Sequence, residues 1–171
     1  MHRPISLLAS ALLGLAGCGG SGGGSEPPPP PAPTPVSKAE AVQLLNQASF
    51  GYVEADAQQV IALDIEGWID NQIAQPASLQ LPFVESLPPP QFMFERHEDR
   101  VDIWFRNVVN GNDQLRQRVA FALSEILVVS QLGALQEAPY ALADYYDVLV
   151  RNAFGNYRTL MQEVTKITRV N

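Results

Sequence analysis

Cys18 carries the only thiol in this 171-residue chain, and its neighbours indicate what that thiol does. It directly follows an apolar segment, Ile5 to Gly17, which itself comes shortly after His2 and Arg3. A basic start, a short apolar stretch and small residues before a cleavage point are typical of a secretory signal. The sequence therefore predicts export. The alternative is an ordinary buried cysteine, which the flanking pattern disfavours.

Leu15, Ala16, Gly17 and Cys18 match, position by position, the lipobox of bacterial lipoprotein precursors. This resemblance implies that Cys18 receives a diacylglyceryl thioether, becomes the new N-terminus and is then N-acylated. Gly19 follows where an aspartate would retain the protein, so the resemblance also implies sorting to the outer membrane, facing the periplasm or the surface. Two or three acyl chains hold a protein stably on a bilayer.

Composition limits the partners that we expect. The apolar segment is 13 residues long, short of the roughly 20 that a membrane-spanning helix needs. No later apolar stretch is longer, so we expect the lipid to be the membrane anchor. The net charge of -7 offers no basic surface for nucleic acid or anionic lipid. The expected partners are the membrane, through the lipid, and an envelope protein of unknown identity.

The chain divides into three parts by composition. Residues 1–17 form the signal peptide, and residues 18–36 combine Cys18 with a glycine- and serine-rich stretch and a proline-rich stretch. Glycine-rich sequence is flexible, whereas a polyproline segment is a stiffer spacer. Residues 37–171 are long enough for one domain with an apolar core.

The hydrophobic pattern in this last part predicts an irregular, all-α, multi-helix domain. Ser37 and Glu40 have the spacing of a capping box at the start of the first helix. Apolar residues recur three and four positions apart in six further segments, and no segment alternates long enough for a strand. The further helices are expected at 54–63, 66–74, 97–109, 113–130, 140–153 and from 157 onward, with a proline-rich loop at 76–92 and Asn112 as a cap.

Glu125 is the polar residue that the sequence singles out within the domain. It lies in an apolar run, where a carboxylate is costly unless it is paired. Arg118 is seven residues earlier on the same predicted helical face. One interpretation is a general acid or base tuned by burial. The other, which we favour, is a buried ion pair that fixes helix register.

The remaining polar clusters predict structural roles. His97 stands among charged residues and is expected on a solvated helix start. Asp147 and Arg151 form an acid-first pair four residues apart, which supports a helix, next to Asp144 and Asn152. His97 is the only histidine after the signal and no further cysteine exists, so we expect no metal and no cofactor.

Longer motifs resemble the bacterial family catalogued as domain of unknown function 1800. The longest runs from Asp113 to Ile126, and others lie at 45–51, at 67–76, at 142–147 and at 151–158. The resemblance extends from about Ala41 to Thr165 and implies a largely helical, exported protein with no assigned reaction.

The resemblance also implies a longer protein. Members of the family continue past the position of Thr165 with a leucine, histidine and proline run, and carry an acidic helix motif much later. Residues 166–171 differ from that continuation. We therefore expect an incomplete N-terminal portion of a larger helical domain, lacking any family site residues beyond Thr165.

Two functions fit these observations. The first is a lipid-anchored envelope protein that acts as a binding or scaffolding module. The second is the N-terminal fragment of an exported, hydrolase-like enzyme that uses Glu125 together with residues outside this chain.

Overall fold

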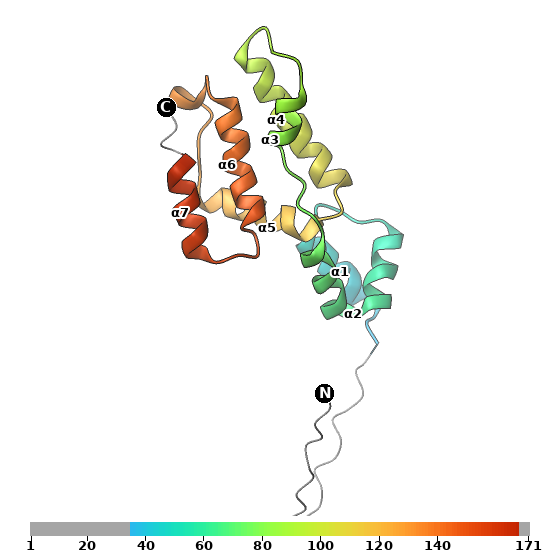
Figure 1. Ribbon diagram of the computed structural model, residues 1–171. Coiled ribbons are helices and arrows are strands. Elements are labelled where there is room, and N and C mark those ends of the chain that lie inside the picture. Colours follow the sequence, from blue (N-terminus) through green and yellow to red (C-terminus); the bar gives the residue numbers. More distant parts are fainter. Residues whose placement is uncertain (1–34, 168–171) are drawn as a thin grey trace, which may run out of the picture. The chain divides into compact units, whose positions relative to one another are not determined.

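The structure is a computed structural model that describes residues 35–167 (Figure 1). The predicted signal peptide, Cys18 and most of the linker lie outside the described residues. Within 35–167 every regular element is a helix, which confirms the all-α prediction. The elements are α1 (Lys38–Ala48), α2 (Glu54–Ala74), α3 (Leu81–Ser86), α4 (Met93–Asn110), α5 (Gln114–Ile126), a 3₁₀ turn η1 (Gly133–Leu135), α6 (Pro139–Arg151) and α7 (Tyr157–Ile167). No helix among them is both long and apolar enough to cross a membrane.

The helix ends show why these segments fold locally. Ser37 and Glu40 form the predicted capping box, in which Glu40 accepts a hydrogen bond of 2.8 Å from the Ser37 amide. α2 contains a kink at Asp64, whose φ of 59° is not helical. Asp64 Oδ1 accepts from the amide of Gly67 at 2.8 Å and so caps the second half. The prediction of two helices on either side of this point is therefore correct in substance.

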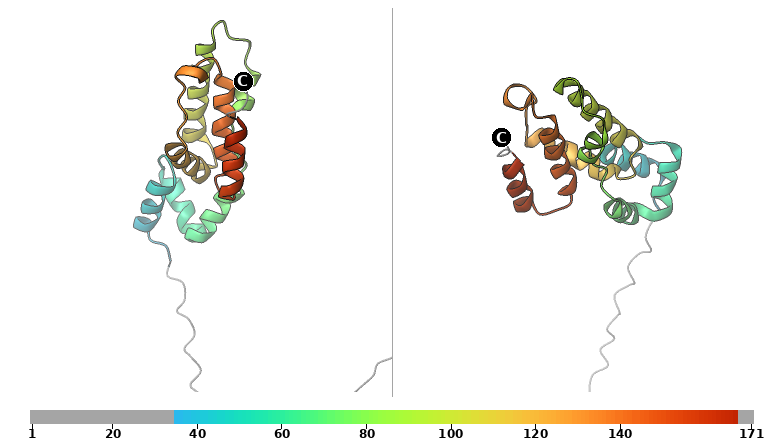
Figure 2. Two further views of the ribbon diagram at one scale, coloured as in Figure 1. Left: turned by 90° about the vertical axis from the view of Figure 1, so that its left-hand side faces the viewer. Right: turned by 45° about the horizontal axis from the view of Figure 1, so that its top comes forward.

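Three clusters of buried side chains form the core. One lies between α1 and α2 and includes Leu45, Val60 and Trp68. Another joins α5, α6 and α7, and a small third joins α3, α4 and α6 through Val84, Ile103 and Ala143. α6 is buried along nearly its whole length. Figure 2 shows α7 packed alongside it.

Several expected boundaries are wrong. α3 forms inside the proline-rich segment predicted as a loop, with a proline in its first turn, where the missing amide donor costs nothing. α5 ends at Ile126, so residues 127–130 are not helical. Val101, Phe105 and Ile126 belong to the apolar helical pattern of the sequence, yet all three are exposed. The α5 cap position is occupied by Asp113 rather than Asn112, and its side chain caps no helix because it contacts Ser78.

Candidate functional site

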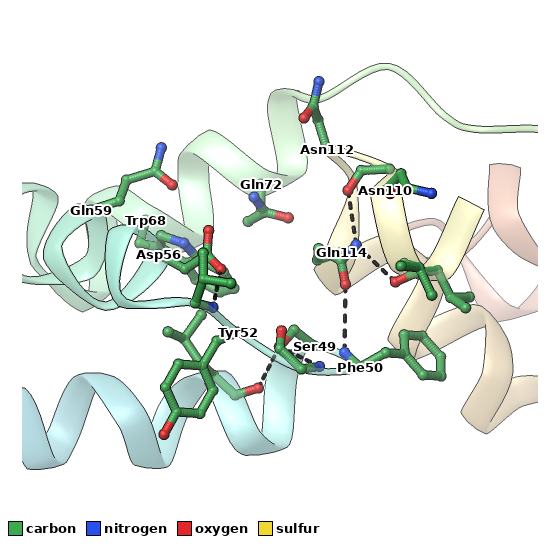
Figure 3. A pocket seen from close by; sticks show the side chains of 16 residues that line it. Ser49, Phe50, Tyr52, Asp56, Gln59, Trp68, Gln72, Asn110, Asn112 and Gln114 are labelled. Atoms are coloured by element: carbon green, nitrogen blue, oxygen red, sulfur yellow. Dashed lines mark hydrogen bonds between the residues drawn. The ribbon is translucent and has the colours of Figure 1, made fainter. Parts of the chain in front are cut away.

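A pocket lies where the turn between α1 and α2 meets the turn between α4 and α5 (Figure 3). Its volume is about 430 Å³, within the range of small-molecule sites. Polar groups on its walls are mostly side-chain amides, together with the Ser49 hydroxyl and the Asp56 carboxylate. The amide residues are Gln59, Gln72, Asn110, Asn112 and Gln114, and three aromatic residues, Phe50, Tyr52 and Trp68, also line the pocket.

Gln114 joins the two turns that form the pocket. Its Nε2 donates to the carbonyls of Val108 at 3.0 Å and Gly111 at 2.8 Å. Its Oε1 accepts from the amide of Phe50 at 3.5 Å. All of its polar atoms are used in this way, so Gln114 positions the walls. Figure 3 shows these bonds bridging the two segments.

Gln72 has a free donor inside the pocket. Its side chain is buried, and its Oε1 accepts from the amide of Leu115 at 3.2 Å, which ties α2 to the start of α5. No hydrogen bond to another described residue uses its Nε2. It lines the same cavity as Trp68. A buried amide donor next to an aromatic ring can orient a polar ligand.

At the rim, Gln59, Asn110 and Asn112 are exposed and make no side-chain hydrogen bonds to described residues. An amide side chain offers both donors and an acceptor. Asp56 supplies the carboxylate of the pocket, and its Oδ2 accepts from the amide of Val53 at 2.8 Å, which caps α2. One fixed negative charge disfavours an anionic ligand.

Arg118 lies behind the Phe50 side of the pocket. Its guanidinium carbon is 5.3 Å from the ring centre of Phe50 and 5.9 Å from that of Phe121. Its Nε donates to the carbonyl of Gln47 at 3.4 Å. Among the described residues it makes no salt bridge to Glu125. The predicted ion pair between these two residues is absent, and Arg118 supports the α1–α2 turn instead.

The family of proteins of unknown function called DUF1800 matches residues 43–168. This chain belongs to that family. The expected resemblance is confirmed, and the matched residues include every residue that lines the pocket. No curated protein and no solved structure matches the chain.

Glu125 of this DUF1800 chain is exposed, which corrects the burial expected from the sequence. α5 ends one residue later, and two apolar residues close to Glu125 face outward: Ile126 is 72 % and Val128 75 % exposed, whereas Leu123, Leu127 and Val129 pack against the core. The apolar run therefore does not surround the carboxylate. Glu125 lines a different cavity, of about 350 Å³, together with Arg100.

His97 is buried, in contrast to the expected solvated helix start. Its Nε2 lies 2.8 Å from the carbonyl oxygen of Gln136, in the segment that joins α5 to α6. Arg96 is also buried and pairs with Asp99 at 2.7 Å. The sequence could not show that segments distant along the chain cover this helix start. No group of three or more His, Cys, Asp or Glu side chains within 35–167 is arranged to hold a metal ion.

Asp147 is fully buried and forms no salt bridge with Arg151, so the predicted helix-supporting pair of these two residues is wrong. Its oxygens accept from the amides of Gln80 at 2.7 Å and Leu81 at 2.9 Å. Burial raises the pKa of Asp147 to about 6, although the two amide donors favour the ionised form. Arg151 pairs with Asp144 at 3.0 Å instead.

Sequence reasoning missed the amide residues of the pocket. Glutamine and asparagine are common on helix surfaces and in turns, so Gln72, Asn110 and Gln114 do not stand out. The glycines of the two turns, Gly51 with a φ of 150° and Gly111, are the signals nearby. A β-carbon at Gly111 would lie 2.4 Å from the carbonyl oxygen of Asn107, so this turn requires glycine.

Proposed function

We propose that this DUF1800 chain is an exported, lipid-anchored binding protein of the outer membrane, whose helical domain binds a neutral, hydroxyl-rich ligand such as an oligosaccharide. The lipobox ending at Cys18 supports the anchor, and the glycine- and proline-rich sequence that follows suits a domain held clear of a membrane. The pocket between the two turns supports the binding role.

The proposed ligand class rests on the side-chain amide groups of the pocket that have no hydrogen-bond partner among the described residues and that lie near an aromatic ring. Gln59, Asn110 and Asn112 at the rim, with Gln72 Nε2 inside, offer donors and acceptors without a net charge of their own. Sugar hydroxyls both donate and accept, so they complement amide groups. A sugar ring also has an apolar C–H face, which can pack on an exposed aromatic side chain such as Tyr52.

The pocket walls are held before any ligand arrives. Gln114 bridges the two turns, and Asp56 is fixed by its bond to the Val53 amide. Pre-organised walls lower the entropic cost of binding. The hydrolase alternative relied on a buried Glu125, and the exposure of this residue removes that argument.

A fluorescence titration tests the proposal. The chain has two tryptophans, and Trp68 lines the pocket whereas Trp104 does not. In a Trp104→Phe background, neutral mono- to tetrasaccharides should change the emission of Trp68 in a saturable way. Charged sugar acids should bind more weakly, because Asp56 repels them.

Replacing rim amides separates specific binding from a non-specific effect. Asn110→Ala combined with Asn112→Ala should weaken binding about tenfold or more, since each lost hydrogen bond contributes about 1 kcal/mol. Gln43→Ala on exposed α1 surface is the matched control and should change nothing. If no neutral saccharide gives a saturable signal, the proposed ligand class is wrong.

A further inference from the structure

A second cavity, separate from the amide-lined pocket, is lined by one positive and one negative side chain that form no salt bridge with each other. It has a volume of about 350 Å³ and lies between α4, the end of α5 and the segment after it, against α6. Arg100 and Glu125 both line it, together with the buried side chains of Leu142 and Tyr146. Neither charged group makes a salt bridge with any described residue.

Arg100 is partly withdrawn from water without an anionic partner. Its Nη2 donates to Gln131 Oε1 at 3.2 Å, and its Nε is buried without a hydrogen-bond partner. Desolvation lowers the pKa of Arg100. Partial burial of an unpaired charge costs free energy. A carboxylate that binds Arg100 would offset this cost. A guanidinium binds a carboxylate through two parallel hydrogen bonds, so Arg100 offers a site for that group.

Glu125 limits which carboxylates the cavity can accept. It is exposed, and no hydrogen bond to a described residue occupies its oxygens. A simple anion next to Arg100 would be repelled by this second charge. A ligand that carries an ammonium group as well as a carboxylate would be attracted by both residues.

The rest of the wall combines apolar surface with a free donor. Val128, Val129 and Leu142 line the cavity. The hydroxyl oxygen of Tyr146 accepts from Trp104 Nε1 at 2.7 Å, so its own O–H remains available to a ligand oxygen. The cavity volume is at the lower end of the range for small-molecule sites.

We propose that this cavity binds a free amino acid with an apolar side chain. The carboxylate pairs with Arg100 and the ammonium group pairs with Glu125. The side chain packs on Val128, Val129 and Leu142. This site is independent of the saccharide pocket, so either can fail in experiment without affecting the other.

Isothermal titration of the purified chain carrying Cys18→Ser, which prevents lipidation, tests the site with three probes. L-Leucine should bind in a saturable way. L-Leucine methyl ester lacks the carboxylate, and N-acetyl-L-leucine lacks the ammonium group. Each should bind about tenfold more weakly or worse, because each loses one charged contact.

Variants assign the two contacts. Glu125→Gln, on an exposed position, should weaken leucine about tenfold but strengthen N-acetyl-leucine, since that probe is an anion and loses only the repulsion by Glu125. Arg100→Gln should weaken leucine but strengthen the methyl ester, since that probe is a cation and loses only the repulsion by Arg100. Glu98→Gln is an exposed control on α4 that does not line the cavity.

Two results would overturn the inference. One is no binding of leucine up to on the order of 10 mM. The other is equal affinity for leucine and its two blocked analogues. If Arg100→Gln does not fold, Glu125→Gln with the three probes decides the question alone.

Discussion

Asp113 and Asp147 lie in different parts of the chain, and both accept hydrogen bonds from nearly adjacent residues of a single loop. Asp113, at the start of α5, accepts from the amide of Ser78 at 2.9 Å and from its hydroxyl at 2.7 Å. Asp147, on α6, accepts from the amides of Gln80 and Leu81. Both carboxylates are fully buried. The α2–α3 loop is therefore attached to two helices by charge-assisted hydrogen bonds.

Asp113→Ala should lower the free energy of unfolding by about 2–4 kcal/mol, because buried donors lose a charged acceptor. Urea denaturation measures this change. A double-mutant cycle with Ser78→Ala should show coupling between the two residues, since both belong to one hydrogen-bonded cluster. Strictly additive effects would contradict the role assigned to this contact.

Asp147 should make stability depend on pH. Its pKa is raised to about 6 in the folded protein, above the ordinary value of 3.8. Between these values the folded state keeps a proton that the unfolded state releases, so stability falls as pH rises from about 4 to about 6. The free energy of unfolding should lose about 2–3 kcal/mol relative to Asp147→Asn, which does not titrate.

Subtracting the free energy of unfolding of Asp147→Asn from that of the parent removes the contribution of the other carboxylates. Chemical denaturation at pH 4 and pH 7 should thus show a larger advantage of the parent at pH 4. Asp102→Asn, on an exposed position of α4, serves as the control and should show little change. An advantage that instead grows toward pH 7 would mean that the amide donors lower the pKa of Asp147.

Two glycines should respond oppositely to alanine. At Gly111 a β-carbon would lie 2.4 Å from the carbonyl oxygen of Asn107, so Gly111→Ala should destabilise the fold by about 1–3 kcal/mol. At Gly67, within a helix, the nearest atoms would lie 3.5 Å away. Gly67→Ala should therefore be neutral or stabilise by up to about 1 kcal/mol. Thermal unfolding of both variants measures the difference, and equal melting temperatures would contradict the steric argument.

Much of the fold was predictable because the sequence signals of a helix lie within a few residues of one another. The Ser37–Glu40 box, the break at Asp64 and the buried face of α6 follow from spacing within a few residues. α3 was missed because proline is compatible with the first turn of a helix. The end of α5 was missed because residues 127–129 continue the apolar pattern after the helix has stopped.

The candidate sites were less predictable, because burial depends on distant segments. Glu125 lies in an apolar run yet is exposed, while Asp147 and His97 look solvated yet are buried under residues far away in sequence. The amide-lined pocket needs two turns about 60 residues apart, joined by Gln114. Nothing in the spacing of glutamines and asparagines indicates that the two turns lie next to each other.

The prediction that concerns export is that Cys18 is lipidated. In cells fed an alkyne analogue of palmitate, the parent chain should be labelled and Cys18→Ser should not, since the thioether forms on that sulfur. Gly19→Asp should keep its label but shift from the outer to the inner membrane fraction. Equal labelling of the parent and Cys18→Ser would contradict the anchor.

The most direct test of the proposed function is NMR of the side-chain amides in the chain carrying Cys18→Ser, titrated with the saccharide that binds best by fluorescence. We expect saturable shifts of the amide signals of Gln59, Gln72, Asn110 and Asn112, with Gln43 unmoved. We also expect that, after replacement of both Asn110 and Asn112 by alanine, the shift at Gln72 saturates only at about tenfold or more higher saccharide concentration. Shifts that are absent from these four residues, or that are equal at Gln43, would contradict ligand binding in this pocket.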